Sequence, residues 1–288
     1  MLLVADPHGN STIGLCPTEG IQLDDEGLYL PSKSQRWAWQ CWQDVVAKAE
    51  VVSASCTTFM TWFMGDMVDR IGKGSQIVTY NDATIVKLGV RFVSDITHLS
   101  HSGVGIIRGT SAHVGDSAYL EEAIAQAVGA KPFPPDSPNA SSWFAKLNLQ
   151  GRIIWLAHHG RLGGMPHTKL NPLGNIAYAA IAEARKNGEA IPDVVCLAHA
   201  HGWGDTHDNF PVRVVQCPAW QLTTEYGNRI KPFQTLPIGA TILTVTDGDI
   251  DIKMHLFHAT PEVAWKPGSA KPKSLPISST PSVAEQLI

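Results

Sequence analysis

The sequence predicts an α/β fold, because short apolar runs of strand length alternate with helical segments along most of its 288 residues. These runs begin near residues 2, 61, 105, 153 and 194, and each leads into an aspartate or a histidine. Both residue types bind metal ions. Because ligand sites of open α/β sheets lie outside the carboxyl ends of the strands, we expect these side chains to meet at one sheet edge.

The composition is that of an ordinary globular protein, with 44% hydrophobic and 17% charged residues. A formal net charge of −4 argues against a large basic surface that grips duplex DNA. The five cysteines are odd in number and widely spaced, which predicts a reducing compartment rather than a disulfide framework. No run approaches the ~20 apolar residues of a membrane span, and the N-terminus lacks signal-peptide features. We therefore expect a cytoplasmic protein with no membrane partner.

Capping signals and apolar periodicity predict the helices. The first is expected from an N-cap at Ser34 to about Glu50, with an apolar stripe that we assign to the core: Trp39, Trp42, Val46 and Ala49. Asn81 or Asp82 is expected to cap a helix over residues 83–96.

Two further helices are expected in the middle of the chain. Ser117 can cap one that begins at residue 119 and ends just before Gly129. Another begins with the Asn-Pro pair at residues 171–172 and ends before Gly188, which fits the preference for proline in the first helical turn and glycine after the last.

The remaining segments predict hairpins and loops. Gln150-Gly151 and Asp247-Gly248 are expected to form tight turns between strands. Residues 11–33 read as a long loop, of a length that is usually functional or disordered. Residues 1–260 are predicted to form one domain. Residues 261–288, rich in Pro, Ser, Lys and Ala, are predicted to be a disordered tail.

A set of aspartates and histidines at the strand ends predicts a metal centre. Asp6 and His8 are separated by one residue, so both can turn toward the same ion. Asp66 can bridge two cations ~3.5–4 Å apart, a spacing that suits displacement on phosphorus. Three histidines complete the set: His158, His199 and His201. His159 is an alternative to His158, because the sequence does not tell which ring faces inward. Mixed imidazole and carboxylate ligands suit Mn, Fe or Zn and argue against calcium.

Five motifs occur in a fixed order: Asp6-Pro7-His8, Gly65 to Arg70, Gly109 to His113, His158, and His199-Ala200-His201. With these motifs, roughly residues 1–260 resemble the calcineurin-like metallophosphoesterase superfamily. The resemblance implies a four-layer α/β/β/α fold, in which two mixed β-sheets pack as a sandwich flanked by helices.

The resemblance also implies a role for each ligand. Asp6, His8, Asp66 and His201 would hold one ion. Asp66, His158 and His199 would hold the other, and Asp69 would orient ligands through hydrogen bonds. Two divalent cations are implied, with Mn²⁺ as the expected ion and Fe or Zn as alternatives.

The third motif departs from the family pattern of Gly-Asn-His. It reads Gly109-Thr110-Ser111-Ala112-His113, so that Thr110 stands at the Asn position and the histidine comes two residues late. His113 is therefore either the general acid or a metal ligand in place of the Asn. If no oxygen ligand replaces the Asn, the second ion should bind more weakly.

The implied chemistry is hydrolysis of a phosphate ester by a hydroxide bound to both ions. His113, Asp69 and Arg70 are the candidate catalytic residues. Arg70 and Arg108 are candidates for holding phosphoryl oxygens through paired N–H bonds. For both arginines, the alternative is an ion pair with a neighbouring acidic residue.

A phosphodiesterase or nuclease acting on nucleic acid or a nucleotide is the first function hypothesis. It rests on residues 6–10, 14–17 and 31–42, which look like a subgroup found in tailed phages and prophages, and it would place the protein in the host cytoplasm. The alternatives are a phosphomonoesterase, including a phosphoprotein phosphatase, and a metal-binding module with little turnover because the third motif is altered. The oligomeric state is left open.

Overall fold

The computed structural model describes residues 1–71, 76–224, 229 and 236–259. Met1–His258 form one compact unit. The predicted tail, residues 261–288, lies outside the described residues, so the domain boundary near residue 260 stays a prediction.

The first sheet has the strand order β12-β11-β1-β4-β5. Its strands are β1 (Leu2–Val4), β4 (Thr61–Phe63), β5 (Val104–Ile106), β11 (Ile238–Thr246) and β12 (Asp249–Phe257). β1, β4 and β5 are parallel, whereas β11 is antiparallel to both of its neighbours. The carboxyl ends of β1, β4 and β5 therefore lie at the same edge.

Three helices form a hydrophobic core with this sheet: α1 (Lys33–Ala54), α2 (Asp82–Thr97) and α4 (Tyr119–Val128). Trp42, Phe92 and Ile124, one from each helix, are fully buried in one cluster with Leu2 and Phe63 of the sheet. The predicted core stripe of the first helix is confirmed, because all four of its residues belong to this cluster.

The second sheet has the order β6-β7-β8-β10-β9. Its strands are β6 (Phe144–Leu149), β7 (Arg152–His159), β8 (Val194–Ala198), β9 (Gly204–Asp205) and β10 (Arg213–Gln216). β7, β8 and β10 are parallel, and the edge strands β6 and β9 are antiparallel to them. Helix α5 (Asn171–Asn187) packs on one face, where Leu173 and Ala177 join a cluster with Val195 and Val214.

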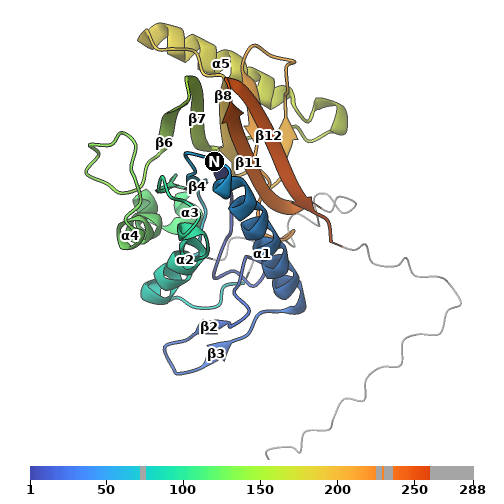
Figure 1. The fold of residues 1–288 in the computed structure, drawn as a ribbon. Helices are drawn as coiled ribbons and strands as arrows, with labels where there is room; N and C mark the ends of the chain where they lie inside the picture. Colours follow the sequence, from blue (N-terminus) through green and yellow to red (C-terminus); the bar gives the residue numbers. More distant parts are fainter. Residues whose placement is uncertain (72–75, 225–228, 230–235, 260–288) are drawn as a thin grey trace, which may run out of the picture. The chain divides into compact units, whose positions relative to one another are not determined.

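The inner faces of the two sheets share a further core. Leu3 and Trp62 of the first sheet lie in one buried cluster with Leu156, Cys196 and Val215 of the second. The layers therefore follow the order helices, sheet, sheet, helix, with α5 at one side and α1, α2 and α4 at the other (Figure 1). This confirms the predicted α/β/β/α class.

Two local predictions were wrong. Helix α1 is capped by Ser32 and not Ser34, because Ser32 and Gln35 form a capping box in which each side chain accepts the other's backbone N–H. Helix α4 is not capped by Ser117, whose backbone is left-handed (φ 55°) in a 3₁₀ turn before the helix. The predicted loop at residues 11–33 also contains a small hairpin of β2 (Ile21–Gln22) and β3 (Leu28–Tyr29).

The other capping and turn signals are confirmed. Asn81 caps α2 by accepting the N–H of Thr84, and α5 ends at Gly188 in the left-handed conformation (φ 67°). The turns at residues 150–151 and 247–248 each place two residues at positive φ, as tight hairpins require.

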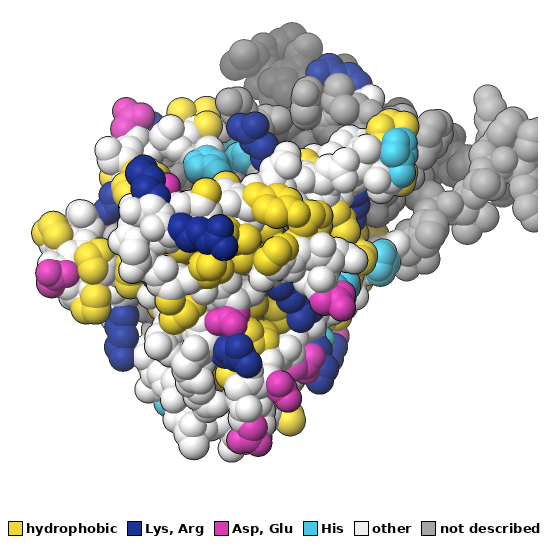
Figure 2. Space-filling view, turned by 90° about the horizontal axis from the view of Figure 1, so that it is seen from above, with side chains coloured by type: hydrophobic (Ala, Val, Ile, Leu, Met, Phe, Trp, Pro, Cys, Tyr) yellow, Lys and Arg dark blue, Asp and Glu magenta, His cyan; other side chains and the backbone are white. Residues whose placement is uncertain are grey.

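In the described part of the chain, no helix combines the length and apolar character needed to cross a membrane. All five cysteines are free thiols, and four of them are buried. On the face drawn in Figure 2, Lys and Arg side chains are interspersed with Asp and Glu around a central band of apolar residues. That face carries no large patch of one charge.

Candidate metal centre

The six predicted ligands lie together where parallel strands of both sheets end. Asp6 and His8 follow β1, Asp66 follows β4, His158 lies at the end of β7, and two histidines follow β8. With His113 and His159, their ligand atoms form four overlapping groups, and within each group the atoms lie within 4.8 Å of one another: Asp6, His8 and His201; Asp6, Asp66 and His158; His8, Asp66 and His113; and His158, His159 and His199. Residues 6 to 201 thus converge on one cluster at strand ends, as predicted, but the strands belong to two sheets and not to a single sheet edge.

The first group joins Asp6, His8 and His201. The Nε2 atoms of the two histidines lie 3.0 Å apart, and Oδ1 of Asp6 lies 3.6 Å from Nε2 of His201 and 3.9 Å from Nε2 of His8. Asp6 and His8 are fully buried. Oδ2 of Asp6 accepts the backbone N–H of His199, whereas Oδ1 has no hydrogen-bond partner among the described residues. That oxygen is free to bind an ion.

The second group is built around Asp66. Oδ2 of Asp66 lies 3.1 Å from Nε2 of His158, and Nδ1 of His158 lies 2.7 Å from the carbonyl oxygen of Met64. The ring of His199 lies with its centroid 5.1 Å from that of His158. Asp66 and His158 are 1% exposed, so this pair has little access to water.

The orientation of two rings fits a bound cation. A carbonyl or carboxylate oxygen only accepts hydrogen bonds, so Nδ1 of His8, facing Asp69, and Nδ1 of His158, facing Met64, must carry protons. With Nδ1 engaged in this way, Nε2 of His8 faces Nε2 of His201, and Nε2 of His158 faces Oδ2 of Asp66. When these rings are neutral, each Nε2 presents a lone pair that can bind a cation, and orienting hydrogen bonds of this kind are typical of metal-binding histidines.

The charges of the centre point in the same direction. Asp6, Asp66 and Asp69 are all buried, and their ion-pair partners among the described residues are histidines. Burial raises the pKa of Asp6 to about 6. Burial lowers the pKa of His8, but the charge of Asp69 outweighs it and raises the pKa to about 9. A buried set of carboxylates is costly unless a cation is present.

Asp69 positions two histidines at once. Its Oδ1 accepts from Nδ1 of His8 at 2.9 Å and from Nδ1 of His113 at 2.6 Å. The ring of His113, on the short helix α3 (Ser111–Val114), stands edge-on to His8 with the centroids 4.6 Å apart. The structure thus brings His113 to the centre and fixes its Nδ1, while Nε2 remains available.

Thr110 donates two hydrogen bonds to Asp66. Its backbone N–H donates to Oδ1 of Asp66 at 2.7 Å, and its hydroxyl donates to Oδ2 at 2.6 Å. Both donors therefore orient the Asp66 carboxylate. Thr110 therefore positions this aspartate.

The two predicted arginines have acidic partners. Nε of Arg70 donates to Asp82 at 3.2 Å, and the Arg70 side chain is 43% exposed. The backbone N–H of Arg70 donates to the carbonyl of His113. Arg108 is nearly buried, donating to Glu122 and Ser141. The phosphate-binding role of both stays a prediction, and Arg70 is the more accessible of the two.

Glu121 is a residue of the site that the sequence analysis missed. It is fully buried, and its two carboxylate oxygens accept the N–H of Met67 at 3.0 Å and of Gly109 at 2.6 Å. Burial raises the pKa of Glu121 to about 7. The side chain ties together the loops that carry Asp66 and Thr110. Only its place as an acid on the buried face of a predicted helix could have revealed it.

Comparison with solved structures finds similar folds at low sequence identity. Vps29 from Entamoeba histolytica, crystallised with Zn²⁺, is 9% identical with a TM-score of 0.41, over 89% of this chain and 97% of that one. A predicted phosphoesterase from Streptococcus pneumoniae is 7% identical with a TM-score of 0.34, over 90% and 96%. NAD nucleotidase from Haemophilus influenzae is 11% identical with a TM-score of 0.38, over 89% and 50%.

No protein-family model and no curated protein matches the chain. At such low scores, the activities of the similar structures do not transfer to this protein. The chemistry of the site therefore has to be inferred from its own side chains.

Proposed function

We propose that this protein is a metal-dependent phosphoesterase with a dinuclear centre. The proposal is carried by one observation: buried carboxylates and histidine nitrogens from the ends of both sheets lie together, with Oδ1 of Asp6 left without a hydrogen-bond partner among the described residues. The four-layer fold and the order of the motifs support the resemblance to the calcineurin-like metallophosphoesterases.

Asp6, His8 and His201 would hold one ion, and His158 and His199 the other, with Asp66 between them. Mixed oxygen and imidazole donors suit Mn²⁺, Fe or Zn²⁺. A pair of such cations supplies a nucleophile at neutral pH and neutralises the charge of a phosphoryl group.

The protein's own side chains would move the proton. Because Asp69 accepts the hydrogen bond from Nδ1 of His113, it fixes the orientation of the ring and directs Nε2 away from itself. Nε2 of His113 would then donate its proton to the leaving oxygen. Arg70 lies beside His113, because its backbone N–H donates a hydrogen bond to the carbonyl of His113. Its guanidinium is the cation that we assign to the outer phosphoryl oxygens.

A phosphodiester of a nucleotide or nucleic acid is the substrate class that we propose first. This choice rests on the phage-like segments in the first 42 residues. The net charge of −4 favours a short or single-stranded substrate over extended duplex DNA.

The test is a turnover assay of the metal-free and the metal-loaded protein with bis-p-nitrophenyl phosphate and p-nitrophenyl phosphate, with bound metal counted in parallel. Two ions per chain and faster turnover of the diester are expected. Asp66→Asn should abolish turnover, whereas Asp249→Asn, at an exposed position of β12, should not. Preference for the monoester would favour the phosphomonoesterase. One ion without turnover, or full activity of Asp66→Asn, would refute the proposal in favour of a binding module or another chemistry.

A further inference from the structure

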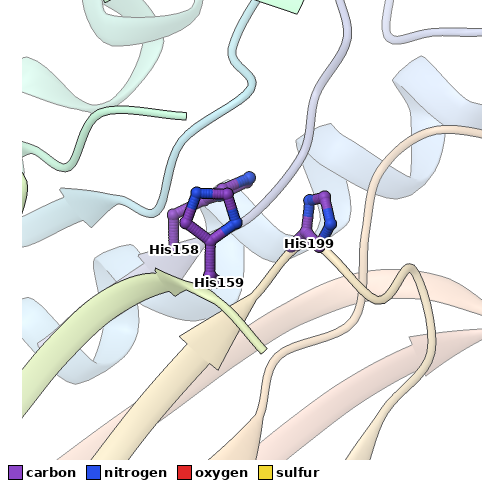
Figure 3. Close-up of side chains that lie close together, drawn as sticks. All are labelled: His158, His159 and His199. Atoms are coloured by element: carbon purple, nitrogen blue, oxygen red, sulfur yellow. The ribbon is translucent and has the colours of Figure 1, made fainter. Parts of the chain in front are cut away.

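Three imidazoles gather at one side of the centre. The rings of His158, His159 and His199 lie at the ends of β7 and β8, side by side (Figure 3). Each pair of ring centroids is 5.1 Å apart, with interplanar angles of 69–71°. One ligand nitrogen from each ring lies within 4.8 Å of the others. His158 and His159 thus approach the same point, although the sequence analysis treated them as alternatives.

A bulge in β7 accounts for two consecutive histidines on one side. In a regular strand, neighbouring side chains point to opposite faces of the sheet. Here Leu156 pairs with Cys196 and His159 with Ala198, so β7 has three steps where β8 has two. The extra residue bends the strand and redirects its last side chains, as bulges beside functional sites commonly do.

The three rings differ in burial, from the buried His158 to the exposed His159, which suits an ion at the solvent-facing side of the centre. His158 is buried, with Nδ1 held by the Met64 carbonyl, which leaves its Nε2 as the ligand atom. His199 is half-buried and His159 is exposed. An ion among them would lie between the buried Asp66 carboxylate and solvent, since Oδ2 of Asp66 is 3.1 Å from Nε2 of His158.

We propose that His159 is a metal ligand, and that His158, His159 and His199 form a tris-imidazole site that prefers Zn²⁺ or Co²⁺ to Mn²⁺. Three histidines with one open or carboxylate position are an established zinc environment, and imidazole donors favour the later transition metals. The position of Asp6, His8 and His201 is richer in oxygen, so the two halves of the centre take different ions. This inference rests on the proposed dinuclear centre and specifies its metals.

The test measures metal affinity directly and needs no substrate. Wild type and His159→Ala are titrated with Zn²⁺ and with Mn²⁺ against a competing chelator, and the absorption spectrum of the Co²⁺-loaded protein is recorded. In His159→Ala, the affinity for one Zn²⁺ should fall by more than about tenfold. Loss of a residue that only hydrogen-bonds to a metal ligand already costs at least about tenfold, and loss of a ligand should cost more. The Co²⁺ visible bands should change, and the Mn²⁺ affinity of the other position should stay the same.

Two further variants sharpen the result. His98→Ala, at the end of α2 with a 57% exposed side chain, is the matched control and should leave all affinities unchanged. His159→Asp keeps a ligand atom but replaces nitrogen by oxygen, so it should restore binding with a lower Zn²⁺ to Mn²⁺ preference than wild type.

Failure of this inference is separable from failure of the proposed function. Unchanged Zn²⁺ affinity and an unchanged Co²⁺ spectrum in His159→Ala would show that His159 is not a ligand, even if Asp66→Asn abolishes turnover. Conversely, a lost Zn²⁺ site in His159→Ala would support the tris-imidazole site whether or not any phosphate ester is hydrolysed.

Discussion

Gly109 lies so close to Asp66 that a methyl group at this position should disable the metal centre. A Cβ added at Gly109 would lie 2.2 Å from Oδ1 of Asp66 and 2.3 Å from its backbone nitrogen. Rotation of the Asp66 side chain relieves only the first contact. The second contact involves the main chain, which is held on the other side because Asp66 O accepts the N–H of His8.

The size of the effect follows from these distances. Ordinary contacts begin near 3.4 Å and the contact with the Asp66 backbone nitrogen would be 2.3 Å, so the two segments must separate by about 1.1 Å in Gly109→Ala. Displacement of a catalytic group by ~1 Å can reduce the rate by ~100-fold. Overpacking of a tight interior costs about 1–3 kcal/mol of folding free energy. The variant should therefore fold, with a lowered melting temperature and a large loss of metal affinity and turnover.

The measurements are kcat/KM with bis-p-nitrophenyl phosphate, Mn²⁺ and Zn²⁺ affinity, and thermal unfolding. Gly164→Ala is the matched control, because a Cβ at that position meets no atom within 4 Å. Wild-type turnover and metal affinity in Gly109→Ala would refute the close approach of Gly109 to Asp66, and with it the described geometry of the centre.

Three further predictions concern charge. Asp69→Asn weakens the bonds to His8 and His113 from charged to neutral, about 1–2 kcal/mol each, so the melting temperature should fall and kcat should fall by at least about tenfold; an unchanged kcat would contradict the role of Asp69. Chelation should lower the melting temperature without unfolding the protein, because ions at ~100 times their Kd add about 2.7 kcal/mol of stability; an unaffected melting temperature would contradict the site. Burial raises the pKa of Glu122, but hydrogen bonds from Ser141 and from the amides of residues 140 and 141 outweigh it and lower the pKa to about 2. A carboxyl pKa that is lower in the folded protein stabilises the fold at pH values above the unfolded pKa, near 4.5. At pH 7 the free energy of unfolding of wild type should therefore exceed that of Glu122→Gln by at most about 2 kcal/mol, after allowance for solvent screening. This difference should shrink as the pH falls toward 2, which acid titrations followed by circular dichroism measure.

The strand ends, the cap of α2 and the end of α5 could be predicted because each depends on local chemistry. Asn81 caps α2 through its own side chain, and the turns at residues 150 and 247 need only a pair of residues tolerant of positive φ. The convergence of Asp6 and Asp66 followed from a general property of parallel strands, whose carboxyl ends share an edge of the sheet, whereas His158 joins them from the second sheet. No tertiary contact had to be known for any of these inferences.

Features that depend on packing across the chain were not predictable. Glu121 belongs to the site because it bonds to Met67 and Gly109, which are 54 and 12 residues away in sequence. The bulge that places His159 beside His158 depends on pairing between β7 and β8, and the sequence of either strand alone reads as regular. The role of Thr110 likewise became visible only from its two hydrogen bonds to Asp66.

The backbone at the ligands explains why the centre should persist without its ions. Five predicted ligands have left-handed φ values: Asp6 (49°), His8 (45°), Asp66 (51°), His199 (73°) and His201 (51°). Each such residue costs about 1–3 kcal/mol and keeps its conformation only where the surroundings enforce it. Here the loops enforce it on one another, because Asp6 donates its N–H to Gly65 O and His8 donates to Asp66 O. Since folding itself holds these conformations, metal binding should add stability to a site that is already formed, and need not create it.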